Sequence, residues 1–205
     1  PVQNLLVSLG EAIATMGSFG SFLYGFFLRL TGAVGLHHTI YPMFWYTSLG
    51  GVAEVAGKTI QGAQNIFFAQ LADPNHTGLF TYGTRFFAGR FATMMFGLPA
   101  GALAMYHTAK ENKKKVAAGL LGAAALSAFF TGVTEPLEFA FMFLAPGLYV
   151  VHALLTGITV AVVAALPVRA GFNFSAGFVD WFLSFKAPMA LNPIYLLGIG
   201  LIVAV

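Results

Sequence analysis

Long stretches without a charged residue dominate this sequence and limit what it can fold into. The chain has 205 residues, of which 58% are hydrophobic and 8% are charged; a soluble domain carries roughly 25% charged residues. Six charge-free stretches are 17 residues or longer: Ala12–Leu28, Leu30–Ala53, Phe91–Ala109, Val116–Thr134, Phe139–Val168 and Ala187–Val205. A helix that crosses a bilayer needs about 20 mostly apolar residues. The pattern predicts an all-α, polytopic integral membrane protein and excludes a soluble domain and a disordered chain.

The stretches differ in how well they fit a membrane span. Phe91–Ala109 and Val116–Thr134 each fit one transmembrane helix. Phe139–Val168 is too long for a simple span and is interrupted at Pro146, so we expect a re-entrant segment followed by a span. Leu30–Ala53 is a poor span, because polar side chains and a proline crowd it.

Two polar segments separate the apolar ones. Glu54–Tyr82 carries nine charged, amide or imidazole side chains up to His76 and is expected to be an aqueous loop, or a short surface helix leading into one. Lys110–Lys115 (KENKKK) is a short basic loop between two predicted spans. Short Lys-rich loops stay on the cytoplasmic side, so Ala109 and Val116 should both face the cytoplasm. This loop sets membrane topology, and nucleic-acid binding is a poor interpretation of it.

Glu135 and Glu138 are the strongest candidates for function, since an ionisable group inside a membrane costs about 2.5–3.5 kcal/mol on insertion scales. Pro136 disfavours helix at Glu135, which predicts a non-helical backbone around a carboxylate that could accept hydrogen bonds from a polyol. Gly132 is expected to break the helix in the same way and to line a cavity. The alternative is a helix start at an aqueous boundary, with Thr134 as N-cap and Glu138 in the first turn. We favour that alternative for Glu138 but not for Glu135.

Arg29 and the pair His37–His38 form a second candidate site. Adjacent histidines point in different directions on a helix or a strand, so no joint metal site is expected. A neutral imidazole can accept a proton from a hydroxyl group. Arg29 could instead extend to the membrane interface, and either histidine could be structural. Asn173 lies in a segment that could line a site or form a loop, and both options stay open.

Three motifs resemble a known family. They are Gly35–His38 (GLHH), Met94–Pro99 (MMFGLP) and Thr131–Phe139 (TGVTEPLEF). In this order and spacing they resemble the membrane-embedded IIC component of bacterial phosphoenolpyruvate-dependent sugar phosphotransferase systems, in the glucose/N-acetylglucosamine/maltose branch. The resemblance covers roughly Phe19 to Asp180.

The resemblance implies an all-helical fold with transmembrane helices and re-entrant helical hairpins, in a protein of the bacterial cytoplasmic membrane. Residues 1–205 would be a fragment of the transmembrane domain, its carboxy-terminal sugar-binding portion. The missing amino-terminal half would form a homodimer. The protein would be the membrane subunit of a sugar phosphotransferase. Phosphate would come from a phosphocysteine on a separate EIIB domain, which agrees with the absence of cysteine here. No cofactor, metal or nucleic acid is implied.

The resemblance also implies roles for particular residues. Glu135 would hold sugar hydroxyl groups, and Arg29 would belong to the same site. His37, with His38 adjacent, would contact the sugar near the hydroxyl that becomes phosphorylated. We expect Thr134, Gly132 and Asn173 to complete the substrate site.

The identity of the sugar is left open by the sequence. Leu154–Gly157 with Ala170–Gly177 look more like members specific for N-acetylglucosamine, whereas Tyr41–Tyr46 through Phe87–Arg90 look more like glucose or maltose members. We favour a glucose-type hexose by a narrow margin. Two other functions are considered: a proton-coupled secondary sugar transporter that delivers unmodified sugar, and a membrane scaffold whose buried polar residues are structural.

Overall fold

The computed structural model describes residues 2–205 and confirms an all-α membrane protein with little strand. In the amino-terminal part the helices are α1 (Val2–Thr15), α2 (Gly17–Leu30), α3 (His37–Tyr46), α4 (Ala63–Ala72) and α5 (Arg90–Ala92). They continue with α6 (Leu98–Thr108), α7 (Lys114–Thr131), α8 (Glu135–Met142), α9 (Pro146–Ala165), α10 (Phe178–Lys186) and α11 (Tyr195–Val203). Short 3₁₀ turns join several of them, including η1 (Thr31–Val34) and η3 (Tyr82–Phe86).

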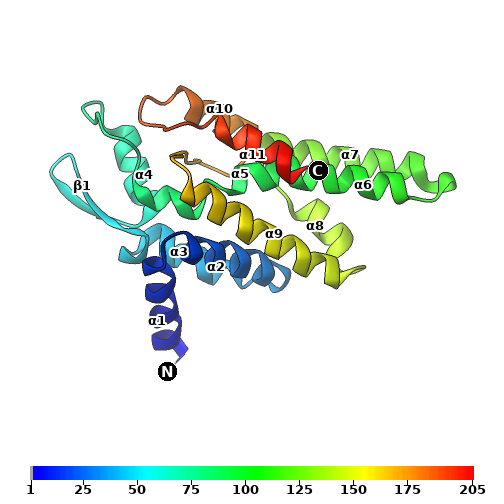
Figure 1. Ribbon diagram of the computed structural model, residues 1–205, viewed down its shortest axis with the longest axis horizontal. Coiled ribbons are helices and arrows are strands. Elements are labelled where there is room, and N and C mark those ends of the chain that lie inside the picture. Colours follow the sequence, from blue (N-terminus) through cyan, green and yellow to red (C-terminus); the bar gives the residue numbers. More distant parts are fainter. Residues whose placement is uncertain (1) are drawn as a thin grey trace.

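Three helical stretches in the described part of the chain are long and apolar enough to cross a membrane. They are Tyr82–Thr108, Glu111–Thr131 and Pro146–Ala165. The first two correspond to the predicted spans, and the third is the span expected within Phe139–Val168. The short helix α8 precedes it, as expected for a re-entrant segment followed by a span. The basic loop joins α6 and α7 into an antiparallel hairpin that extends to one side of the molecule (Figure 1).

A π-helical segment, Thr93–Gly97, interrupts the first of these long helices. Pro99 follows it as the second residue of α6. Proline has no N–H and its ring clashes with the carbonyl four residues earlier, so a regular α-helix cannot run unchanged through Met95. Wider π turns are often found at functional sites. This one places Met94 against the cavity described below.

Helix α2 packs along α9 near the centre of the molecule (Figure 1). Gly157 of α9 makes this close approach possible, because a Cβ atom there would lie 2.9 Å from the carbonyl oxygen of Phe22 and 3.0 Å from Cβ of Phe26. Small residues at such positions allow membrane helices to come together. Gly157 therefore serves close helix packing at this interface.

The core beside α2 is built largely from aromatic rings. Tyr24, Phe44, Phe86, Phe87 and Phe172 are all almost fully buried. The rings of Tyr24 and Phe44 are 4.9 Å apart, those of Phe44 and Phe86 are 4.7 Å apart, and those of Phe87 and Phe172 are 5.2 Å apart. Aromatic pairs at these distances add to the energy of burial. They fix α2, α3 and η3 to the loop that follows α9.

The prediction for Glu54–Tyr82 was incomplete. Part of this segment belongs to an antiparallel hairpin, β1 (Val52–Val55) with β2 (Lys58–Gln61), and α4 follows directly. The hairpin projects from the end of the molecule opposite the α6–α7 loop (Figure 1). Its strands are four residues each, too short and too polar to stand out in the sequence.

The predicted non-helical backbone at Glu135 is wrong, since Glu135 is the first residue of α8. The break comes earlier. Gly132 ends α7 with φ +71°, and a Cβ atom there would lie 2.6 Å from Oγ of Ser175. The Thr134 carbonyl then accepts the N–H groups of Leu137 and Glu138, which begins the new helix. The helix-start interpretation is thus right for the backbone, although the site is a cavity and not an open aqueous boundary.

Candidate functional site

The helix break between α7 and α8 faces a cavity of about 250 Å³. Segments far apart in the sequence line it. They are the end of α2, one face of α3, α5 with the π segment, the α7–α8 break with the start of α8, α9 near Thr156 and the loop at Phe174 and Ser175. The α2–α9 packing and the aromatic core hold these segments together. Ligand sites in proteins are typically such concave pockets with a few convergent polar groups.

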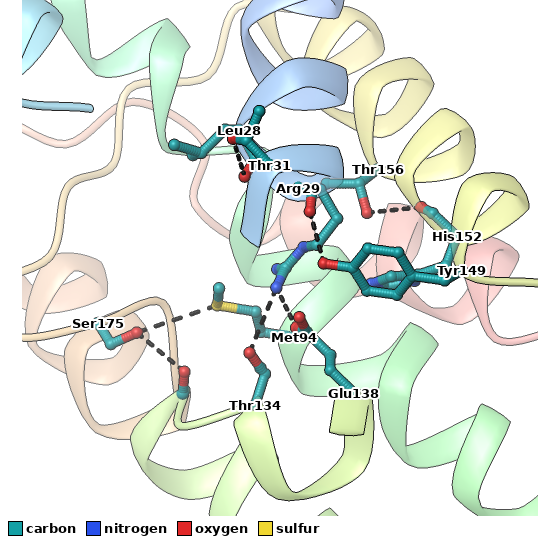
Figure 2. A network of polar contacts seen from close by, with 11 residues as sticks. Leu28, Arg29, Thr31, Met94, Thr134, Glu138, Tyr149, His152, Thr156 and Ser175 are labelled. Atoms are coloured by element: carbon teal, nitrogen blue, oxygen red, sulfur yellow. Dashed lines mark hydrogen bonds and ion pairs between the residues drawn. The ribbon is translucent and has the colours of Figure 1, made fainter. Parts of the chain in front are cut away.

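An ion pair between Arg29 and Glu138 crosses the wall of the cavity (Figure 2). Both side chains are largely buried, and the Arg29 guanidinium also donates to Oγ1 of Thr134 at 3.3 Å. The hydroxyl of Tyr149 on α9 donates to the Arg29 carbonyl at 2.6 Å. Arg29 therefore links α2 to α8 through its side chain and to α9 through its backbone. A side chain that extends to the membrane interface would not be buried and paired, so that interpretation of Arg29 does not fit the structure. Glu138 lies in the first turn of a helix and also binds Arg29.

Glu135 lies on the same cavity but has a different environment. It is exposed rather than buried, and its carboxylate is in neither ion pair found among the described residues. One carboxylate of the motif is thus engaged by arginine, while the other stays available to a ligand.

His37 enters the cavity from the start of α3. Its Nδ1 atom is buried and has no hydrogen-bond partner among the described residues. Burial lowers the pKa of His37, and the neighbouring His38 and Arg29 act in the same direction, while Glu135 opposes them. A lowered imidazole pKa keeps the ring neutral at pH 7. A neutral ring with a free nitrogen can accept a proton or a hydrogen bond.

Aromatic side chains supply the apolar part of the lining. Tyr41 and Trp45 lie one turn apart on α3, with ring centroids 4.5 Å apart, and both face the cavity. The indole N–H of Trp45 donates to the buried hydroxyl of Tyr24 at 3.0 Å, which fixes the ring. Phe139 and Phe174 line other parts of the wall. A rigid aromatic face beside polar groups suits a ligand that is apolar on one side and polar at its edges.

Arg90 is a second guanidinium on this cavity. It is the first residue of α5 and lies over the ring of Phe172, with 5.5 Å between the guanidinium carbon and the ring centroid. Neither of the ion pairs found in the described part of the chain includes it.

The structure brings together five of the seven residues that were predicted to form the sugar site, and Glu138 with them. Arg29, His37, Gly132, Thr134 and Glu135 all line the cavity.

The remaining two lie outside its lining. His38 is exposed, and its Nδ1 atom lies 3.3 Å from the hydroxyl of Tyr41. Asn173 borders a separate pocket, and its backbone N–H donates to Asp180 at 2.9 Å. The next two residues of that loop reach the cavity in its place.

Sequence reasoning missed other lining residues with polar or aromatic side chains, among them Tyr41, Trp45 and Arg90. Tyr41 and Trp45 are spaced i, i+4, a signal that they share a helix face. Nothing local in the sequence distinguishes Arg90 from an arginine at a helix end.

The fold and the cavity together define a class: an all-α membrane protein with a small polar and aromatic pocket between its helices. A comparison with protein families places the chain within that class. Residues 1–157 match the family model described as "Phosphotransferase system, EIIC". This match covers more than half of the chain, so the protein belongs to the EIIC family. It is a membrane component of a sugar phosphotransferase system, a sugar permease whose family works with an EIIB partner.

Proposed function

We propose that this cavity binds a hexose, which the protein carries across the bacterial cytoplasmic membrane for phosphorylation by EIIB. The observation that carries the proposal is the carboxylate of Glu135, which has no ion-pair partner among the described residues and lies on the same cavity as His37 and Trp45. A carboxylate accepts hydrogen bonds from two sugar hydroxyl groups. The ring of Trp45 offers a flat apolar surface to the C–H face of a pyranose.

The size of the cavity favours a monosaccharide. About 250 Å³ lies just below the range of about 300–1,000 Å³ found for drug-sized ligands. Glucose and N-acetylglucosamine are therefore better candidates than the disaccharide maltose, and glucose stays our first choice. Arg29, Thr134 and Gly132 shape the wall beside Glu135, with Arg29 held by Glu138.

His37 is proposed as the base for the transfer step. The sugar hydroxyl oxygen forms a bond to the phosphorus of an EIIB phosphocysteine, and the phosphorus–sulfur bond breaks. Its electron pair returns to the sulfur as a thiolate, and the hydroxyl proton passes to neutral His37. His38 packs beside the His37 ring, with 4.0 Å between centroids, and would support its orientation. Asn173 would not contact the sugar itself; its loop would contribute through Phe174 and Ser175, which line the cavity.

The wider assembly is also a proposal. Residues 1–205 would be the sugar-binding, carboxy-terminal portion of an EIIC domain that dimerises through its amino-terminal half. Family membership does not favour the proton-coupled transporter, because that function involves no EIIB partner. A purely structural role for the polar residues does not explain why Glu135 and the Nδ1 atom of His37 lack partners within the described residues.

The test is a binding screen on the full-length protein. Calorimetric titrations with glucose, N-acetylglucosamine and maltose are compared for wild type, Glu135→Gln and His37→Ala. Hydrogen bonds to a charged group contribute about 1.5–3 kcal/mol, so Glu135→Gln should weaken binding of the preferred monosaccharide at least tenfold. Glu54→Gln removes an exposed carboxylate of β1 outside the cavity and serves as the matched control. It should leave the Kd unchanged within twofold.

Two results would contradict the proposal. Wild-type affinity in both Glu135→Gln and His37→Ala would show that the sugar binds elsewhere. Maltose binding more tightly than either monosaccharide would overturn the size argument.

A further inference from the structure

We propose that Arg90 is the anion-binding residue of this cavity and holds the phosphoryl group of the phosphorylated hexose. The inference rests on the proposed function, because it concerns a ligand that would form only if the cavity phosphorylates a sugar. It adds a second subsite, for a charged group, to the subsite for sugar hydroxyl groups around Glu135.

The first argument comes from the distribution of charge. Four ionisable groups that are charged at neutral pH line the cavity: Arg29, Arg90, Glu135 and Glu138. Arg29 and Glu138 neutralise each other through their ion pair. An anion entering the cavity therefore meets one carboxylate that repels it and one guanidinium that has no carboxylate within 4 Å among the described residues. Only Arg90 can compensate its charge.

The second argument comes from how Arg90 is held. Its guanidinium lies over the ring of Phe172, which is 2% exposed and belongs to the aromatic core. A guanidinium that contacts an aromatic ring uses none of its N–H donors in that contact. No hydrogen bond from these groups is found within residues 2–205. A planar fork of free donors matches two oxygens of a phosphoryl group.

The third argument is energetic. An unpaired cation in a protein interior is costly, and Arg90 lies among core residues, with only part of its surface open to the cavity. A neutral sugar alone would leave this guanidinium without an ion-pair partner within 4 Å among the described residues. A phosphorylated sugar would compensate it without competing for the ion pair between Arg29 and Glu138.

The experiment compares two probes, glucose and glucose 6-phosphate, on the full-length protein by calorimetry. Arg90→Gln should raise the Kd for glucose 6-phosphate at least tenfold and the Kd for glucose by a much smaller factor. Arg169→Gln is the matched control, because Arg169 packs on the ring of Tyr82 and does not line the cavity. It should change neither Kd by more than twofold.

A second variant keeps the test decisive if Arg90→Gln fails to fold. Arg90→Lys retains the charge but loses the planar pair of donors. It should weaken glucose 6-phosphate binding about threefold or more and weaken glucose binding less.

The outcomes separate the two proposals. If wild type binds glucose but not its phosphate, or if the Arg90 variants weaken both ligands equally, the phosphoryl subsite is wrong and the hexose site stands. If wild type binds none of the sugars or their phosphates, the proposed function itself fails.

Discussion

Two carboxylates only three residues apart in the sequence have opposite environments. Glu138 is buried and paired with Arg29, whereas Glu135 opens onto the cavity. The helix start places them on neighbouring turns of α8, and the approach of α2 brings the arginine to one of them. The motif thus supplies both a structural acid and an available acid, and the sequence alone does not reveal which is which.

The ion pair between Arg29 and Glu138 makes a prediction for stability. Glu138→Gln leaves the Arg29 charge buried without its partner, and breaking a buried pair in this way costs about 3–5 kcal/mol. We expect a clear fall in the melting temperature of the detergent-solubilised protein, measured by fluorescence. The double variant Arg29→Gln/Glu138→Gln should recover part of the loss, because no buried charge remains.

The matched control is Glu111→Gln, which breaks the exposed pair between Glu111 and Lys114. Exposed pairs contribute about 0–1 kcal/mol, so its melting temperature should hardly change. Equal stability of Glu138→Gln and Glu111→Gln would show that the buried pair does not stabilise the fold.

At the scale of helices, the interface between α2 and α9 decides where Arg29 lies. Gly157→Leu would place a large side chain against Phe22 and Phe26. Overpacking of this kind costs about 1–3 kcal/mol, and displacement of α2 would also move Arg29. We expect both a lower melting temperature and weaker sugar binding.

The control for this change is Gly119→Leu on α7, where an added Cβ meets no atom within 4 Å. Leucine favours helix over glycine by roughly 1 kcal/mol, so this variant should be at least as stable as wild type. A stable, sugar-binding Gly157→Leu protein would mean that α2 and α9 can separate without consequence.

Several elements could be predicted from the sequence because the signals are local. Charge-free runs indicated the spans, and Gly132 with Pro136 indicated a break between α7 and α8. The exact start of α8 was misplaced, since Pro136 restricts Glu135 but is readily accepted in the first turn of a helix. The hairpin escaped prediction because Val52–Val55 and Lys58–Gln61 are short and only partly apolar.

Residues of the candidate site could be predicted only where they belong to a recognisable sequence motif. The ion pair joins positions 109 apart in the sequence, and Arg90 comes to the cavity through the packing of α5 against α9 and α11. Such pairings depend on the tertiary fold. His38 and Asn173 were predicted for the site but are not part of the cavity lining. Each is next to a lining residue, but its own side chain is directed elsewhere.

At the scale of the whole molecule, the polar ends are separated along its longest axis. The basic loop Lys110–Lys115 lies at one end and the hairpin β1–β2 at the other (Figure 1). The long helices run between them. Helices α6 and α7 expose mostly apolar side chains along their length, as expected of helices in contact with lipid or further membrane segments.

This arrangement predicts the orientation of the protein in the membrane. Because the chain contains no cysteine, a single introduced cysteine is a unique label. Asn112→Cys lies in the basic loop and is exposed. An excess of Lys and Arg keeps short loops in the cytoplasm, so a membrane-impermeant maleimide should label it only after the cells are opened. Thr59→Cys, exposed on β2 at the opposite end, should be labelled in intact cells. Labelling of Asn112→Cys in intact cells would reverse the orientation, and with it the face at which EIIB must meet the sugar.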